Sequence, residues 1–435
     1  MNLPENKKRV LCILYHFPPL GGIPVMRSLR LVKYLSKFNW QPIVLTSRFG
    51  YDNIQGTDVS LMEQLPQKLK IIRVNDTIGK LLNLCDKKLS SFIMYQLDRL
   101  SKVLFFPDEK LVWSIMSVIK YRASIKSDLN IDLIYASGFP WSSLLLGYWL
   151  KKYTNRPLIL DFRDGWSISP NPLWRRFYFH RKMERKIIEA ADKVIFATEG
   201  LRTEYAKQYP NFSRKFKTIY NGFDPDFFPV EIAKKRLRRS SQMKLLYAGS
   251  LSDSIPPKNR SRTIIPLLNG LNNIKNRHPE IYEKISFEVY SNDIPNTRKF
   301  ILNESLSDKV TLRSKIGYKE IIGKMFESDV LLLIVMNDIF SKYIAPAKLY
   351  EYIAVGKPIL ALTPAFSEAF KIIQKYKLGS IVTYENLEED LVDKLSRLID
   401  GNDHSQNGIF REAQHVFNGK KLVGEFAFQF NSVIN

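Results

Sequence analysis

The sequence predicts an α/β protein with two similar doubly wound domains that face each other across a cleft. Three observations support this fold class. Apolar runs of strand length alternate with segments of helical spacing along the chain. The 435 residues suffice for two domains with full cores. Near the middle, the stretch NGFDPDFFP and the basic KKRLRRSSQ interrupt the alternation. We predict an N-terminal domain, a linker, a C-terminal domain and a last helix that could pack back toward the first domain, at 1–225, 226–243, 244–410 and 411–435.

The chain opens with a predicted strand, helix and strand, at residues 9–15, 24–38 and 41–46. Gly21 and Gly22 lie between the first strand and the helix, where the missing side chains let the backbone approach a ligand. They do not form the GxGxxG pattern of dinucleotide sites, and an ordinary tight turn is the alternative. Arg27 and Arg30 follow in the first turns of the helix. They either favour a bound anion or are simply surface charges.

The rest of the first domain continues the alternation, and one of its strands ends in acidic residues. Asp161 and Asp164 stand at the carboxyl end of the strand predicted at 157–161, where open α/β sheets place their ligands. They could do acid–base work or bind hydroxyl groups. The alternative is a turn linked by Arg163, with a helix cap. The other predicted strands are 69–74, 133–136, 193–198 and 217–220, and the helices are 78–104, 110–125, 142–153 and 199–208.

Basic residues are concentrated in the first half of the chain. Of the net charge of +23, residues 1–230 carry +16, which favours anionic partners such as phosphorylated ligands, an acidic membrane face or nucleic acid. The segment 174–186 mixes four aromatic with six basic residues. A helix of this composition can lie against an anionic membrane. The alternative is a core-facing helix with a solvated charged face.

Composition limits the class of protein. With 45% hydrophobic and 25% charged residues, the chain resembles soluble globular proteins. No run approaches the ~20 apolar residues that span a bilayer, and residues 1–9 lack the order of a secretory signal. Two cysteines are too few for a disulfide framework. We expect a cytoplasmic protein. Without a recognised binding motif, we expect no nucleic-acid partner.

The second domain repeats the α/β alternation. Its predicted strands are 245–248, 285–290, 310–312, 330–335, 359–362 and one around 382, and its helices are 263–276, 318–327, 387–399 and 410–431. Before it, the sequence Asp224-Pro225-Asp226 has the outline of a DxD metal motif. Its proline-flanked context favours a turn instead.

The segment 329–363 is the most informative unit of the second domain. A buried strand leads through a loop to a helix that Pro346 can start and Gly356 can cap in the left-handed conformation. The start of such a helix is a natural anion site, because free N–H groups and the helix dipole point outward. Lys348 lies in the first turn and Glu351 three residues later. The alternative for these two residues is a solvated ion pair.

These motifs resemble those of the GT-B glycosyltransferases, specifically the family 4-like sugar-nucleotide transferases of bacterial surface polysaccharide synthesis. The resemblance touches both halves: YHFPPLGG…RSLRLVKYL, ASGFPWSS, LDFRDGW, ADKVIFAT, YNGFD, LLYAGSLS and AKLYEYIAVGKPILAL. It implies two Rossmann-like domains, an acceptor on the first and a nucleotide diphospho-sugar on the second. It also implies that no metal and no cofactor besides this donor is needed. The departing diphosphate would be stabilised by the helix start and basic side chains.

Residue by residue, the resemblance implies that Glu351 binds the ribose hydroxyls. Lys348 and the backbone of Pro346 and Ala347 should lie near the diphosphate. Gly21 and Gly22 would border the donor phosphates and the acceptor. The catalytic residues that we expect are Gly22, Asp164 and Lys348.

The sequence departs from the family pattern at two places. Gly249, Ser250 and Lys258 occupy the loop where relatives usually carry an Arg and a Lys for the diphosphate, and Ser250 stands near the expected Arg. Tyr343 stands where many relatives carry a Glu that contacts the transferred sugar. Tyr343 and Ser250 are therefore expected donor contacts of unusual chemistry.

We therefore expect a metal-independent glycosyltransferase, peripheral at the inner face of the membrane. It would move a hexose-type sugar from a nucleotide diphosphate sugar to a lipid-linked or polysaccharide acceptor, with retention. One rival is a sugar-nucleotide epimerase, whose acid–base cluster is not evident among five scattered histidines. Another is a catalytically silent assembly subunit, which Tyr343 and Ser250 suggest.

Overall fold

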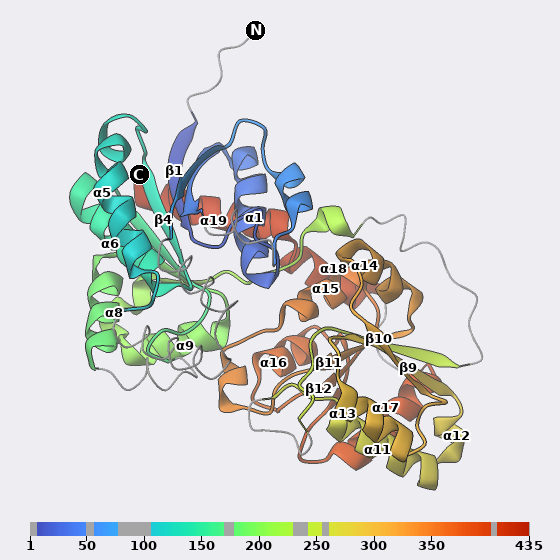
Figure 1. Ribbon diagram of the computed structural model, residues 1–435. Coiled ribbons are helices and arrows are strands. Elements are labelled where there is room, and N and C mark those ends of the chain that lie inside the picture. The colour runs from blue at the N-terminus through green and yellow to red at the C-terminus, as the bar shows by residue number, and fades with distance from the viewer. Residues whose placement is uncertain are drawn as a thin grey trace, which may run out of the picture. The chain divides into compact units, whose positions relative to one another are not determined.

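The computed structural model divides the chain into two compact units (Figure 1). The first unit joins Met1–Tyr220 to Lys420–Asn435, and the second spans Asn221–Gly419. The helix predicted at 78–104 lies outside the described residues, as do Lys258 and the first part of the aromatic, basic segment. The structure describes residues 7–48, 56–76, 106–168, 178–228, 242–254, 261–401 and 407–434.

The first unit is built on a seven-stranded parallel sheet in the order β3-β2-β1-β4-β5-β6-β7. The central strand β1 lies between β2 and β4, so Cys12 is paired with Val44 on one side and Tyr135 on the other. The strand order reverses between β1 and β4, and open sheets bind ligands beyond the carboxyl ends at such a point. The strands are β1 Lys8–Leu14, β2 Trp40–Ser47, β3 Lys70–Val74, β4 Leu133–Gly138, β5 Leu158–Phe162, β6 Lys193–Phe196 and β7 Phe216–Thr218.

Helices cover both faces of this sheet. On one face, α6 approaches so closely that a Cβ on Gly147 would lie 2.7 Å from the Cβ of Ala136. On the other face, α1 packs beside α19, the last helix of the chain. The helices are α1 Ile23–Leu35, η1 Ser36–Phe38, η2 Val59–Gln64, α5 Leu111–Ser127, α6 Trp141–Thr154, α8 Tyr178–Ala190, α9 Glu199–Gln208, η3 Pro210–Lys215 and α19 Gly419–Ile434.

Aromatic side chains of α19 complete the core of the first unit. The ring of Phe430 lies edge-on to Trp40 at 5.4 Å and 5.6 Å from Tyr135, and Phe426 is 5.7 Å from the same tyrosine. All four rings are buried. The end of the chain is therefore an integral part of the first unit.

The second unit is built on a six-stranded parallel sheet in the order β10-β9-β8-β11-β12-β13. Helices α11 and α17 pack on one face through an apolar cluster that includes Leu268, Phe287 and Leu395. The strands are β8 Met243–Ala248, β9 Ile285–Ser291, β10 Val310–Ser314, β11 Val330–Ile334, β12 Ile359–Leu362 and β13 Gly379–Val382. The helices are η4 Pro225–Phe227, α11 Ile265–Arg277, α12 Pro279–Tyr282, α13 Pro295–Asn303, α14 Tyr318–Glu327, η5 Ile339–Lys342, α15 Ala347–Val355, α16 Glu368–Lys375, α17 Leu387–Ile399 and α18 Asn407–Val416.

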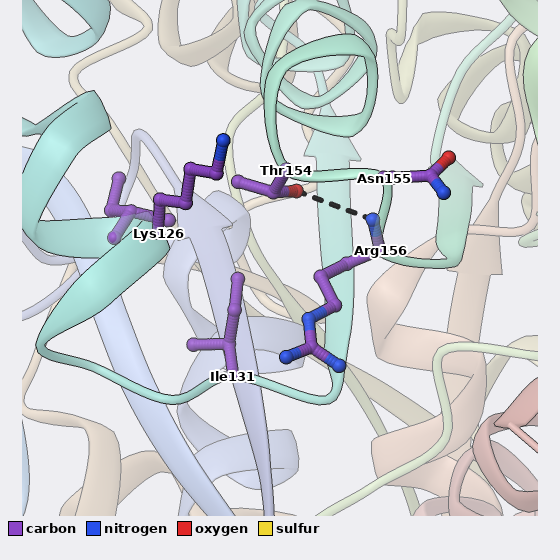
Figure 2. Close-up of a pocket in the computed structure, with 6 residues that line it drawn as sticks. Lys126, Ile131, Thr154, Asn155 and Arg156 are labelled. Carbon is purple, nitrogen blue, oxygen red and sulfur yellow. Dashed lines mark hydrogen bonds between the residues drawn. The ribbon is translucent and has the colours of Figure 1, made fainter.

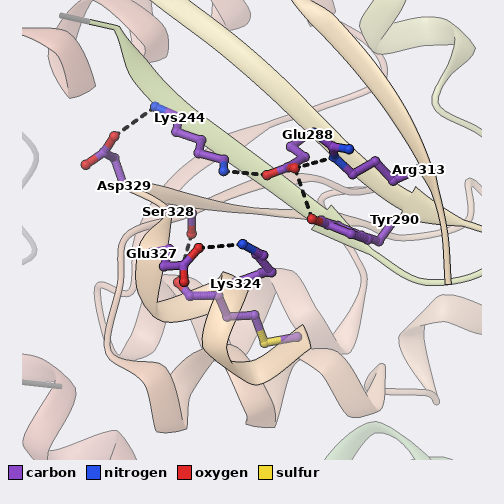
Figure 3. A network of polar contacts seen from close by, with 9 residues as sticks. Lys244, Glu288, Tyr290, Arg313, Lys324, Glu327, Ser328 and Asp329 are labelled. Carbon is purple, nitrogen blue, oxygen red and sulfur yellow. Dashed lines mark hydrogen bonds and ion pairs between the residues drawn. The ribbon is translucent and has the colours of Figure 1, made fainter. Parts of the chain in front are cut away.

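Charged side chains connect the three strands at the β10 edge of this second sheet (Figure 3). Glu288 of β9 pairs with Lys244 of β8 at 2.5 Å and with Arg313 of β10 at 2.6 Å. The hydroxyl of Tyr290 also donates to Glu288, at 2.9 Å. Burial alone would raise the pKa of Glu288, but these donors hold it below its usual range. The cluster thereby holds the edge strand β10 in register.

Two parallel sheets with helical layers confirm the predicted α/β class, and two details of the prediction were wrong. The helix expected at 410–431 is two helices, because Phe417 and Asn418 leave the helical conformation to pair with Phe223. The N–H of Phe223 donates to Phe417 O at 3.1 Å, and the N–H of Gly419 donates to Phe223 O at 2.8 Å. The prediction also lacked α13 and α16. The second of these begins at Ser367, whose hydroxyl caps the N–H of Phe370 at 2.9 Å.

Candidate active site

The start of α15 forms the centre of the candidate site in the second unit. Pro346 is the N-cap residue, with φ −60° and ψ 138°, and Ala347 is the first helical residue. Proline is therefore one residue earlier than predicted. Gly356 ends the helix at φ 74°, which confirms its predicted left-handed cap. The strand β11 precedes this helix in a parallel sheet, so the helix start and its free N–H groups lie toward the carboxyl edge.

Lys348, in the first turn of α15, carries the most unusual charge of the site. Its ammonium lies 4.8 Å from the centre of the Tyr247 ring and fills the space above Gly249, where a Cβ would be 1.4 Å away. Within the described part of the chain it makes no hydrogen bond or ion pair. Burial and the positive charge of Arg262 lower the pKa of Lys348 to about 7. The charge of Glu351 offsets this only in part, so an anion bound at this half-buried ammonium would be stabilised.

Two further cations accompany Lys348. Arg262 precedes α11, and its Nε is buried without a hydrogen-bond partner among the described residues. Lys315 follows β10 and donates to the hydroxyl of Ser250 at 2.8 Å. Both charges lower the pKa of Lys348. A lysine from another loop, Lys315, therefore lies beside Ser250, the position near the expected arginine. The site contains three cations, Lys348, Arg262 and Lys315.

Glu351 lies one turn further along α15 and is half-buried. The hydroxyl of Tyr318, at the start of α14, donates to Glu351 Oε1 at 3.0 Å. Lys348 does not lie within ion-pair distance of Glu351, so the solvated ion pair is not what the structure contains. A carboxylate oriented in this way can accept a hydrogen bond from a ligand hydroxyl.

Tyr343 follows η5 and is 8% exposed. Its ring lies under the ammonium of Lys342 at 4.6 Å and 6.2 Å from the ring of Phe340. The position where relatives carry a glutamate is thus an aromatic, largely buried one.

Hydrogen bonds to the segment after β9 hold the loop that follows β8. Gly249 has φ +149°, a conformation that favours glycine. The N–H of Leu251 donates to Asn292 at 2.9 Å. Asp253 accepts from the N–H groups of Asn296 and Thr297, at 2.9 and 2.8 Å, at the start of α13. Gly249 and Ser250 are therefore placed by contacts that the sequence did not reveal.

In the first unit, Gly21 and Gly22 lie where predicted, before α1. Gly22 is the N-cap with φ +85°, and Gly21 donates to the carbonyl of Gly56 at 2.7 Å. A Cβ on Gly21 would come within 3.1 Å of that carbonyl oxygen. Both positions therefore require glycine for backbone reasons, as in the tight-turn alternative, and Gly22 is exposed at the helix start.

The predictions for Arg27 and Asp161 were wrong, because the two residues form a buried ion pair with each other. Arg27 Nη2 and Nε contact the two carboxylate oxygens of Asp161 at 2.7 and 3.0 Å. Tyr135 and Ser137 donate to the same carboxylate at 2.6 and 2.9 Å. Burial opposes the charge on Asp161, but Arg27 holds its pKa below the usual range. Asp161 is therefore structural, and Arg27 and Arg30 are both buried rather than exposed surface charges.

Asp164 remains available at the end of β5, since its side chain is exposed. Arg163 beside it is half-buried, and within the described residues its guanidinium makes no hydrogen bond or ion pair. Burial and the charge of Arg163 lower the pKa of His16, at the end of β1, to about 4. His16 is therefore neutral. It lies at the same edge of the sheet as Asp164, which the sequence did not indicate.

The outline of a DxD motif at 224–226 is part of a turn in the structure. Asp224 accepts from the N–H of Asp226 at 3.1 Å and caps η4, so the turn interpretation of this motif is confirmed. The described residues contain no cluster of metal-ligating side chains.

Comparisons with known proteins bear on the fold. Residues 26–227 match Glycosyltransferase Family 4. No curated protein matches the chain. Sucrose-phosphate synthase from Thermosynechococcus elongatus has a TM-score of 0.65 at 15% identity, over 98% of this chain and 99% of that one. HepE from Anabaena, solved with UDP, gives 0.62 at 16%, over 98% and 100%. A glycosyltransferase from Rickettsia africae gives 0.62 at 16%, over 99% of both chains.

The chain therefore has the fold of the GT-B glycosyltransferases, which confirms the fold that the resemblance implied. Within that class, its N-terminal part carries the pattern of Glycosyltransferase Family 4.

Proposed function

We propose that the protein transfers a hexose-type sugar from a uridine diphosphate sugar to a lipid-linked or polysaccharide acceptor, with retention and without a metal. The observation that carries the proposal is Lys348, a half-buried ammonium at a helix start that makes no hydrogen bond or ion pair among the described residues. The choice of uridine is supported by HepE, which was solved with UDP and with UDP-glucose. A diphosphate would supply the missing negative charge.

In this proposal the donor occupies the carboxyl edge of the second sheet. The diphosphate contacts Lys348, Arg262 and the backbone at Pro346 and Ala347, and Glu351 accepts from the ribose hydroxyls. As the sugar bond breaks, negative charge grows on the leaving diphosphate. The helix dipole and the cations stabilise that charge more than they stabilise the intact donor.

The acceptor occupies the carboxyl edge of the first sheet. Gly22 exposes backbone there, and Asp164 would orient the attacking hydroxyl. We place the protein on the cytoplasmic side of the membrane, where lipid-linked acceptors would be reached. Among the described residues, none of the helices is both long and apolar enough to cross a bilayer.

A thermal-shift screen tests the donor class. We expect UDP and UDP-sugars to raise the melting temperature of the wild-type protein more than ADP, GDP or their sugars, because binding stabilises by mass action. Lys348→Met should lose the shift. Lys284→Met, which changes an exposed lysine at the amino end of β9, serves as the matched control and should keep it. Equal shifts with all bases, or none, would remove the proposed donor.

The catalytically silent subunit remains the second candidate, because Tyr343 replaces the family glutamate. It predicts the same thermal shift without release of UDP when acceptor-containing membranes are added. A coupled assay for released UDP separates the two functions. An epimerase would convert the donor with no acceptor present.

A further inference from the structure

Helices α5, α6 and α8 lie together in the first unit (Figure 1), and large apolar side chains of α5 and α8 are exposed to solvent. On α5, Ile115, Met116 and Ile119 are 39%, 44% and 65% exposed. On α8, Tyr178 and Phe179 are 74% and 68% exposed. Helix α6 packs against both other helices, so the three helices form one layer. Apolar side chains exposed in this way mark an interaction surface.

Basic side chains adjoin these apolar groups. The exposed face of α5 continues from Ile119 into Lys120, Arg122 and Lys126, and this helix contains no acidic residue. Arg122 and Lys126 both lie over the ring of Tyr153 of α6, at 5.6 and 5.2 Å. Their charged groups thus lie against an aromatic ring, and both residues are exposed at the surface.

The same arrangement joins α6 to α8. Lys152 and Lys186 lie 6.0 and 5.7 Å from the ring of Tyr148. Helix α8 adds the exposed basic residues Arg181, Lys182 and Arg185. The acidic residues at the surface of this layer are few: Asp128 and Glu189 are exposed, and the half-buried Asp192 pairs with Lys151 at 2.6 Å. The surface is therefore strongly positive.

A hollow of about 330 Å³ lies at the basic end of α5 (Figure 2). Lys126 and Arg156 stand at its wall, with Ile125 and Ile131 as apolar lining. The N–H of Arg156 donates to the hydroxyl of Thr154 at 3.3 Å, which ties the chain segment that carries the guanidinium. Among the described residues this guanidinium makes no ion pair. The hollow offers a phosphate group two cations.

We propose that the face made by α5, α6 and α8 docks on a bilayer rich in anionic phospholipid. Isoleucine and methionine would enter the acyl boundary, and the flanking lysines and arginines would meet the headgroups, with one phosphate in the hollow at Lys126 and Arg156. Exposed aliphatic side chains do not contribute to binding of nucleic acid, whereas they can insert into a bilayer. The positive charge of this face complements an acidic lipid surface. The inference does not depend on the donor chemistry, and it would bring the enzyme to a lipid-linked acceptor.

Cosedimentation with vesicles tests this surface. Wild-type protein should bind vesicles of phosphatidylcholine with 30% phosphatidylglycerol, bind pure phosphatidylcholine at least tenfold more weakly, and detach in 0.5 M salt. Ile119→Glu should weaken binding at least tenfold. Leu302→Glu, at a site 62% exposed in the second unit, is the matched control and should bind normally. Replacing Lys120, Arg122 and Lys126 by glutamine should cost roughly fivefold per cation, and Arg156→Gln should cost a similar factor.

All variants should retain the melting temperature and the nucleotide affinity of the wild type, which separates this inference from the proposed function. Failure of wild-type protein to bind the anionic vesicles would overturn the docking proposal. So would unchanged binding by Ile119→Glu, or self-association of the wild type through Ile119 detected by gel filtration.

Discussion

The lowered pKa of Lys348 predicts that donor binding takes up a proton. In the free protein the ammonium has a pKa of about 7, so about nine-tenths of it is neutral at pH 8. A bound diphosphate favours the charged form and raises that pKa. A group whose pKa rises on binding strengthens affinity at low pH, and the gain is lost as pH increases above the free pKa. Affinity should therefore be highest below pH 7 and approach a tenfold loss per unit well above it, which amounts to roughly fiftyfold from pH 7 to pH 9.

Calorimetry with UDP-glucose between pH 6 and 9 measures this dependence. A nucleotide sugar is the right probe because its diphosphate has no terminal group that titrates near pH 6, unlike UDP itself. Comparing buffers of different ionisation enthalpy at pH 8 should reveal uptake of about 0.9 proton. Lys348→Arg, whose guanidinium stays charged, should flatten the profile.

Arg262→Gln removes one cation that lowers the pKa of Lys348. It should move the inflection of the affinity profile to higher pH. A wild-type affinity that is flat from pH 6 to 9, or the same slope in Lys348→Arg, would refute the reasoning.

Three further predictions concern stability and the ribose contact. Lys348→Met should stabilise the free protein by about 2–4 kcal/mol at pH 6, because it removes a charge that folding buries. This gain should shrink toward pH 10, where the lysine of the folded wild type is neutral, and urea unfolding at both pH values measures it. Glu351→Ala should weaken nucleotide binding at least tenfold, whereas Tyr318→Phe should weaken it only a few-fold; unchanged affinity of Glu351→Ala by calorimetry would remove this residue from the site. Arg27→Met should destabilise the protein by roughly 3–5 kcal/mol because it leaves Asp161 buried and unpaired; a loss below 1 kcal/mol in urea unfolding would contradict the buried pair.

The unit around α15 could be predicted because its signals are local. A short apolar strand, Pro346 and Gly356 each act within a few residues of their position in the chain. Other parts of the site depend on distant partners. Arg27 lies 134 positions from Asp161, and nothing near either residue indicates the other. Arg262 and Lys315 reach Lys348 only because three strands meet at one sheet edge.

The return of α19 to the first unit had a similar cause. Its apolar residues predict a helix, but only the rings of Trp40 and Tyr135 define the cavity that Phe430 fills. The break at Phe417 and Asn418 was missed because it depends on hydrogen bonds to Phe223, far away in sequence. The sequence could predict the helix and its possible return toward the first domain, but not the rings that it contacts.

Because Gly249 has no side chain, the ammonium of Lys348 can occupy the space beside its backbone. A methyl group there would overlap Lys348 Nζ. Gly249→Ala would therefore displace the ammonium and weaken phosphate binding, although it removes no polar group. Two positions 99 residues apart thus behave as one functional element. A residue larger than glycine at position 249 can be tolerated only together with a side chain shorter than lysine at position 348.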